Sequence, residues 1–311
     1  MSDMVTHWAA FEDCRRLAQL DDKIEPVFRE VIESKREVGR LGTLTRLGAK
    51  WMQPMLETAR NQLRASGKDE IAKRNLAYVL GGLVHQATDN VMKPVLTNMS
   101  GANWTQMQAS LRGTPNTPKV DDDAAERAHE FSAYLDAEVF KQVYLDGGAE
   151  PLSQFFMSEV NASGKAFEDF VRALFQRSLL SAHTLNPTAD NMGDMADWLD
   201  NLFALVQPFF VDVDRWVRVY QHPDPKKIED FGIRTTFYRP DDPTIRAARA
   251  LQHGKLVDAQ TREAVFDQGT HVCVYGQILQ VGIMYIRAAA AFWRGETKDL
   301  VAPNFAQWEP A

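Results

Sequence analysis

A histidine and an aspartate lie four residues apart in the segment GGLVHQATDNVMKPVL, which covers residues 81–96. In a helix, this spacing places His85 and Asp89 on one face, with their Cβ atoms about 5 to 6 Å apart. An imidazole nitrogen and a carboxylate oxygen at that separation can bind the same divalent cation. Two simpler interpretations remain open: Asp89 orients the ring of His85, or both side chains face solvent.

The same helical row continues toward the N-terminus with Ala77 and Gly81, which have almost no side chain. Small residues on a helix face allow a second helix to approach closely. We therefore expect another helix to pack against this row and to bring further ligands toward His85 and Asp89.

A second polar row contains His129, Ser132 and Asp136, which share one face of a predicted helix. Two turns separate His129 from Asp136 by about 10.5 Å along the helix axis, which is too far for one ion. A pair of ions about 3.5 to 4 Å apart could use one residue each. A solvated helix face that begins with the acidic residues 121–123 explains the pattern equally well.

The third candidate is His7, in the segment THWAAFED. A histidine this close to the start of a chain is usually exposed and has no specific function. His7 is therefore informative only in combination with the other two histidine segments.

Helices are needed to position these side chains, and helical periodicity dominates the sequence, whereas alternating strand patterns are scarce. Asp242 before Pro243 is typical of a helix start, and Arg294 before Gly295 is typical of a helix end. The sequence predicts an all-α fold, with residues 1–311 forming a single multi-helix domain. The expected helices cover residues 7–20, 25–37, 43–65, 69–96, 121–145, 151–160, 164–183, 189–206, 242–252 and 260–294.

Two segments interrupt the helical pattern. Residues 97–120 are rich in Asn, Thr, Gly and Pro, and residues 221–243 contain several prolines among charged residues. Either segment could be a domain boundary. A loop of about 20 residues inside a compact domain is often functional, so residues 97–120 could also form a lid over a site.

The charge balance bears on the partners. The chain has 35 basic and 42 acidic residues, and the basic ones are scattered and form no stripe, which argues against a nucleic-acid partner. Cys14 and Cys273 lie far apart, so neither a disulfide framework nor a cysteine zinc site is predicted. Together with an acidic N-terminus that does not resemble an export signal, this favours a cytoplasmic protein.

One apolar stretch is long enough to raise the question of a membrane span. Residues 272–293 are largely apolar, but Gln277, Gln280 and Arg287 interrupt them. We therefore expect a buried core helix and no transmembrane segment.

The segment YVLGGLVHQATDNVMKP resembles the central helix of the zinc-dependent phospholipase C superfamily, a group of all-α enzymes related to single-strand-specific zinc nucleases. The segment VTHW is similar to the N-terminal segment of that family, and ERAHEFSAYLD falls where the family has a further ligand helix. The closing YGQILQVGIMYIRAAAAFWRG is similar to the family's final helix, which packs against the metal helices. The central helix matches at Tyr78, Leu80, Gly81, His85, Asp89 and Pro94.

The resemblance implies a zinc-dependent hydrolase acting on a small phosphodiester or a phospholipid head group. Its metal ligands would be His7, His85, Asp89 and His129. Zinc lowers the pKa of a bound water and neutralises charge on the phosphate oxygens, which explains how such a ligand set supports phosphodiester hydrolysis. Asp136 or Lys93 would assist catalysis.

The chain also departs from the family pattern. Lys93 stands where the family has a second histidine, and Ala133 stands where an acidic ligand would follow His129. The family's Gly-Pro-Asp turn, and the histidine between that turn and the central helix, have no counterpart here. We therefore expect one or two zinc ions in place of three. The positive charge of Lys93 would either repel a metal or bind phosphate.

The incomplete ligand set leaves a second hypothesis open. In this alternative the chain is a non-catalytic helical binding or scaffold protein with the same fold and a decayed metal site. Metal content and hydrolytic activity distinguish the two hypotheses.

Overall fold

The computed structural model describes residues 4–44, 49–66, 70–100, 122–145, 223–267 and 269–306. Helices account for 77% of this part of the chain, which contains no strand, so the predicted all-α class is confirmed. The α-helices are α1 (Met4–Ala18), α2 (Pro26–Ser34), α3 (Arg36–Leu44), α4 (Ala49–Ser66), α5 (Glu70–Ser100), α7 (Asp122–Phe140), α10 (Pro225–Asp230), α11 (Pro243–Gln252), α12 (Ala259–Phe266) and α13 (Val274–Arg294), and the π-helical turns are η1 (Lys141–Leu145) and η2 (Ile233–Phe237).

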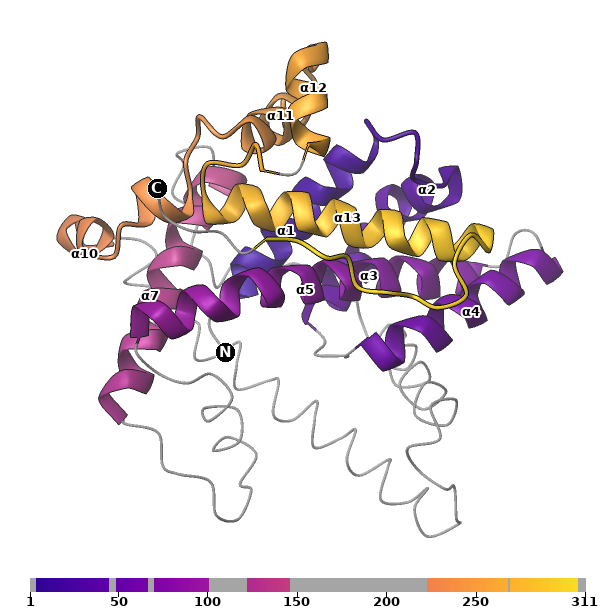
Figure 1. Cartoon of the computed structure of the whole chain (residues 1–311), viewed down its shortest axis with the longest axis horizontal. Helices are drawn as coiled ribbons and strands as arrows, with labels where there is room; N and C mark the ends of the chain where they lie inside the picture. Colours follow the sequence, from indigo (N-terminus) through magenta and orange to yellow (C-terminus); the bar gives the residue numbers. More distant parts are fainter. Residues whose placement is uncertain are drawn as a thin grey trace, which may run out of the picture.

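Helix α5 lies at the centre of the described fold. It packs against α3, α4 and α13, and Figure 1 shows α5 and α13 running side by side. Helix α1 contacts α5, α7 and α13. The first helix of the chain is therefore held against the central helix, which carries the His85–Asp89 pair.

The apolar stretch near the C-terminus forms the core helix that the sequence predicts. Most of α13 is buried, and its buried glutamines find partners: Gln277 donates to the carbonyl of Ala306 and Gln280 donates to Thr270 Oγ1. Among the residues that the structure describes, no helix is both long enough and apolar enough to span a membrane.

The start of α11 and the end of α13 have the capping residues that the sequence predicts. The Asp242 carboxylate accepts hydrogen bonds from the backbone N–H groups of Thr244 and Ile245, and Pro243 occupies the first turn of α11. Helix α13 ends at Gly295, whose φ of 83° lies in the left-handed region that glycine adopts without strain.

Several predicted boundaries are wrong. The expected helix over residues 260–294 is interrupted between α12 and α13, because the buried Asp242 carboxylate also accepts the Val272 N–H and because Cys273 caps α13. Within the expected helix over residues 43–65, α3 ends at Leu44 and α4 begins at Ala49, and the residues between them lie outside the described part of the chain.

The two segments expected to be irregular are partly helical. Helix α5 continues through Pro94 to Ser100 and so includes the first residues of the 97–120 segment, while α10 and η2 lie within residues 221–243. Residues 101–120 of the possible lid at 97–120 lie outside the described residues, as do the helices expected at 151–160, 164–183 and 189–206.

A buried carboxylate ties α1 to α3. Glu12 is fully buried, and its Oε1 accepts hydrogen bonds from Arg36 Nε at 2.6 Å and Arg40 Nε at 2.7 Å, while Oε2 accepts one from Arg15 at 3.1 Å. Burial alone raises the pKa of Glu12, but attraction to Arg40, Arg36 and Arg15 outweighs burial and lowers the pKa from 4.5 to about 2.

This lowered pKa predicts acid-sensitive stability. Glu12 contributes its full stabilisation above its unfolded pKa and loses it as pH falls toward the folded value. At about pH 5 the native chain should therefore be more stable than Glu12→Gln. The difference in their free energies of unfolding should shrink by about 3 kcal/mol as the pH falls to about 2. Denaturant unfolding at several pH values measures this difference.

Glu296→Gln is the matched control, because Glu296 also pairs with an arginine but its side chain is 55% exposed. Its effect on the unfolding free energy should change little over the same pH range. A pH-independent effect of Glu12→Gln would contradict the prediction.

Candidate metal site

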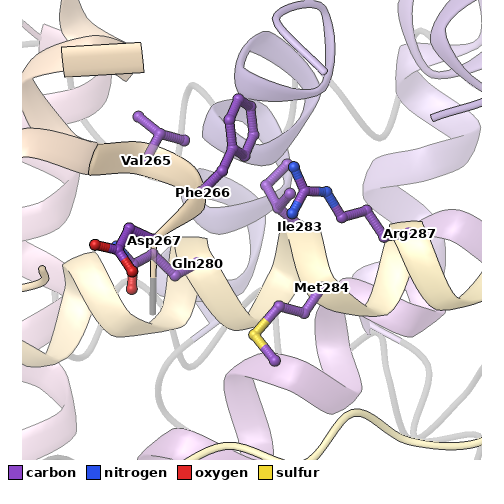
Figure 2. Close-up of a pocket in the computed structure, with 7 residues that line it drawn as sticks. All are labelled: Val265, Phe266, Asp267, Gln280, Ile283, Met284 and Arg287. Carbon is purple, nitrogen blue, oxygen red and sulfur yellow. The ribbon is translucent and has the colours of Figure 1, made fainter. Parts of the chain in front are cut away.

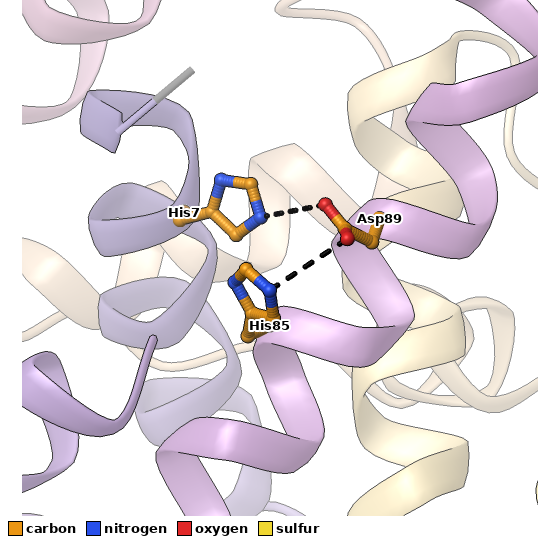
Figure 3. Close-up of side chains that lie close together, drawn as sticks. All are labelled: His7, His85 and Asp89. Carbon is orange, nitrogen blue, oxygen red and sulfur yellow. Dashed lines mark ion pairs between the residues drawn. The ribbon is translucent and has the colours of Figure 1, made fainter. Parts of the chain in front are cut away.

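Three of the predicted ligands meet at one point. His7 comes from α1, and His85 and Asp89 come from α5 (Figure 3). One ligand atom from each residue lies within 4.8 Å of the other two. His7 Nε2 is 3.4 Å from Asp89 Oδ1, and His85 Nε2 is 3.6 Å from Asp89 Oδ2. Residues 7 and 85 are thus brought to one carboxylate by the packing of α1 on α5.

The second ring nitrogen of His85 has a defined partner. Its Nδ1 lies 2.7 Å from the backbone carbonyl oxygen of Thr43, on α3. A carbonyl oxygen only accepts, so Nδ1 must carry the proton and donate it. With Nδ1 engaged by Thr43, Nε2 is left facing Asp89, and metal-binding histidines are commonly oriented by such an outer hydrogen bond.

Two of the distances between ligand atoms, each to a different oxygen of Asp89, resemble those around a metal ion. Tetrahedral zinc with bonds of about 2.0 to 2.1 Å places its ligand atoms about 3.3 Å apart. The two nitrogen–oxygen distances at the site, 3.4 and 3.6 Å, are close to that value. The rings of His7 and His85 stack with centroids 4.5 Å apart. Neutral imidazole is the form that binds metals.

Asp89 is the negative centre of the site. Burial raises its pKa, but the opposing attraction of His7, His85 and Lys93 prevails and holds the pKa well below its usual value. Lys93, one turn further along α5, places its Nζ 2.8 Å from Asp89 Oδ2. The predicted assisting residue Lys93 is thus a direct neighbour of the metal ligands.

The site runs from the interior to the surface. The side chains of His7 and His85 are 4% and 8% exposed, whereas those of Asp89 and Lys93 are 20% and 35% exposed. A small molecule would therefore approach from the Lys93 end.

Glycines bring α3 close to α5, as the row of small residues predicts. A Cβ atom on Gly81 would lie 1.9 Å from the Gly39 carbonyl oxygen, and a Cβ on Gly42 would lie 2.1 Å from the Tyr78 carbonyl oxygen. Neither contact could be tolerated, so both positions require glycine. The close approach brings the backbone carbonyl of Thr43 to His85 in place of the ligand side chain that we expected. The sequence could not identify Thr43 as part of the site, because Thr43 contacts His85 through its backbone carbonyl and not through its side chain.

Asp136, predicted as an assisting catalytic residue, holds the start of α1. Its Oδ1 accepts hydrogen bonds from the Thr6 N–H at 2.9 Å and the Thr6 hydroxyl at 2.7 Å, and its Oδ2 accepts one from the Val5 N–H at 3.2 Å. A carboxylate at this position neutralises the unpaired N–H groups of the first turn, as an N-cap does. Asp136 therefore positions His7, the next residue along α1.

The remaining predicted ligand is His129. Its backbone belongs to α7, which also contacts α1 and α5, but its side chain lies outside the part of the chain that the structure describes.

The described residues also form a shallow hollow of about 10 Å³, too small for more than about one water molecule, that is unrelated to the site. It lies between α12 and α13 (Figure 2), and one of its lining residues, Arg287, already pairs with Asp21 and lies 4.5 Å over the Phe266 ring. None of the predicted site residues lines it. Its lining residues are Val265, Phe266, Asp267, Gln280, Ile283, Met284 and Arg287.

The other described histidines lie at or near helix ends, away from the site. His253 caps the C-terminal end of α11, and His271 lies 3.0 Å from Gln280 Oε1. Cys14 and Cys273 are buried free thiols. His183 and His222 lie outside the described residues.

Comparisons with protein-family models, with curated proteins and with solved structures give no match for this chain. The arguments for its function therefore come from the geometry of the site.

The contacts of Asp136 predict that it controls the metal affinity of the site without binding metal. Asp136→Asn removes the charge that holds the start of α1, so His7 should lose its fixed position. We expect the affinity for Zn²⁺ to fall by about 10-fold, within the range that outer-shell substitutions produce. Isothermal titration calorimetry with the native and variant chains measures this change.

Asp258→Asn is the matched control, because Asp258 caps α12 by accepting the Thr261 N–H far along the chain from the site. It should leave Zn²⁺ affinity within about 2-fold of the native value. Equal affinities for the native and Asp136→Asn chains would show that Asp136 does not position the ligands.

Proposed function

We propose that this chain is a metal-dependent phosphodiester hydrolase similar to zinc-dependent phospholipase C, with a cation held by His7, His85 and Asp89. The observation that carries the proposal is that imidazoles from two helices point their Nε2 atoms at the two oxygens of one carboxylate, at 3.4 and 3.6 Å. In addition, the Thr43 carbonyl orients His85 for metal binding.

Two histidines and one carboxylate fit zinc in a catalytic setting. Catalytic zinc sites commonly use three protein ligands and keep a fourth position for water or substrate. When bound, zinc would supply a water of lowered pKa and would neutralise charge on a phosphate group. The same donor set also binds ferrous iron in some oxygenases, so identification of the bound metal is part of the test.

The chain's own residues supply the surroundings that such a reaction requires. Burial of His7 and His85 excludes water from the inner side of the site, and the more exposed Asp89 leaves the outer side open to a substrate. In this proposal Asp136 acts as a positioning residue. His129 is proposed as a further ligand, which would allow one or two ions.

The alternative function, a non-catalytic binding or scaffold protein with a decayed site, is supported by one specific contact. The Lys93 ammonium already neutralises Asp89 at 2.8 Å, so the charges of the cluster can balance without a metal. In that case the cluster would serve only to hold α1 against α5.

His85→Ala separates the two functions. In the proposed hydrolase, the native chain purified without chelator should contain about one equivalent of transition metal, and the variant should contain less than about 0.2. Hydrolysis of bis-p-nitrophenyl phosphate should fall by about 100-fold or more in the variant, since the cation supplies the nucleophile. Elemental analysis and a phosphodiesterase assay measure both quantities.

His253→Ala is the control, because His253 is an exposed histidine at a helix end. Its metal content and activity should equal those of the native chain. A native chain with less than about 0.2 equivalents of metal and no activity would contradict the hydrolase and leave the scaffold function.

A further inference from the structure

Lys93 stands between the metal ligands and solvent. Its Nζ lies 2.8 Å from Asp89 Oδ2, the oxygen that also faces His85 Nε2 at 3.6 Å. His7 faces the other oxygen of the same carboxylate. The single negative charge of Asp89 therefore faces two imidazoles and one ammonium group, and the ammonium group of Lys93 is a permanent cation.

A divalent cation bound by Asp89 and the two histidines would compete with this ion pair. It would place two positive charges beside the oxygen that the Lys93 ammonium contacts, and like charges at such short distance repel. The Lys93 side chain is 35% exposed and has a flexible stem, so it can withdraw from Asp89 without unfolding α5.

We infer that Lys93 changes partner when the site fills. Without a cation it neutralises Asp89, and once a cation has taken Asp89 it binds the phosphate group of the substrate. This inference rests on the proposed function. A phosphate bridging the cation and the ammonium removes the repulsion between them, and the lysine ammonium is a common point-charge partner of phosphate.

The exchange couples the two binding events. Because an anion relieves the repulsion that a cation creates, each ligand strengthens the binding of the other by the same factor. Lys93 is thus a specificity-determining residue: it weakens cation binding in the absence of substrate and favours substrates that carry a phosphate at the metal.

The test measures the affinity of the full chain for Co²⁺ by calorimetry, alone and with methyl phosphate or dimethyl phosphate. For the native chain, a phosphate ester should tighten Co²⁺ binding by about 10-fold, within the usual range of such coupling. For Lys93→Met, Co²⁺ alone should bind about 10-fold more tightly than to the native chain, and the coupling should fall below about 2-fold.

Two further variants make the result specific to the Lys93 charge. Lys93→Arg keeps the charge and should keep most of the coupling. Lys73→Met removes an ion-paired lysine from the same helix, where Lys73 contacts Glu30, and should behave as the native chain does. If dimethyl phosphate tightens Co²⁺ binding, the substrates are phosphodiesters. If methyl phosphate tightens Co²⁺ binding and dimethyl phosphate does not, the substrates carry terminal phosphates.

The outcomes separate this inference from the function on which it rests. Coupling of equal size in the native and Lys93→Met chains, or no coupling in the native chain, overturns the role of Lys93 and leaves the metal site standing. A native chain that binds no Co²⁺ overturns the metal site and the inference together.

Discussion

The charge of Asp89 is the constraint on which the site depends. A carboxylate that is four-fifths buried must be compensated by nearby positive or hydrogen-bonding groups, because its desolvation is costly. His7, His85 and Lys93 provide this compensation from two helices. The contact between α1 and α5 is therefore electrostatic at this point, while the core around it is apolar. In the proposed function, a divalent cation would neutralise the same carboxylate together with the same two histidines.

The helices that surround the carboxylate restrict where its partners can lie. Asp136 on α7 fixes the first turn of α1, and the close contact at Gly81 fixes α3 against α5. Glu12 joins α1 to α3 through Arg36 and Arg40. These contacts fix α1, α3, α5 and α7 relative to one another, which restricts the positions that His7 and His85 can take.

Local pattern predicted the parts of the site that are close in sequence. The spacing of His85 and Asp89 placed both on one face of α5, and the small residues of that face predicted the approach of another helix. The same reasoning predicted the all-α class and the capping by Asp242 and Gly295. Periodicity alone, however, did not reveal the break between α12 and α13. The Val272 N–H in this break donates a hydrogen bond to the Asp242 carboxylate, which lies 30 residues earlier in the chain.

Long-range contacts were harder to predict. His7 was singled out only in combination with the other histidines, and its distance of 3.4 Å from Asp89 results from tertiary packing. Asp136 was predicted to assist catalysis, and in the structure it accepts hydrogen bonds from the backbone N–H groups of Val5 and Thr6 and from the Thr6 hydroxyl. Thr43 was missed because it acts through a carbonyl oxygen, which every residue possesses.

The central claim is that the Nε2 atoms of His7 and His85 and a carboxylate oxygen of Asp89 bind one cation. X-ray absorption spectroscopy at the zinc edge of the Zn²⁺-loaded chain tests it most directly. The account predicts a four-coordinate spectrum with two imidazole nitrogens at about 2.0 to 2.1 Å, and the loss of one imidazole in His7→Ala. A six-coordinate, all-oxygen spectrum, or an imidazole signal that His7→Ala leaves unchanged, would contradict it.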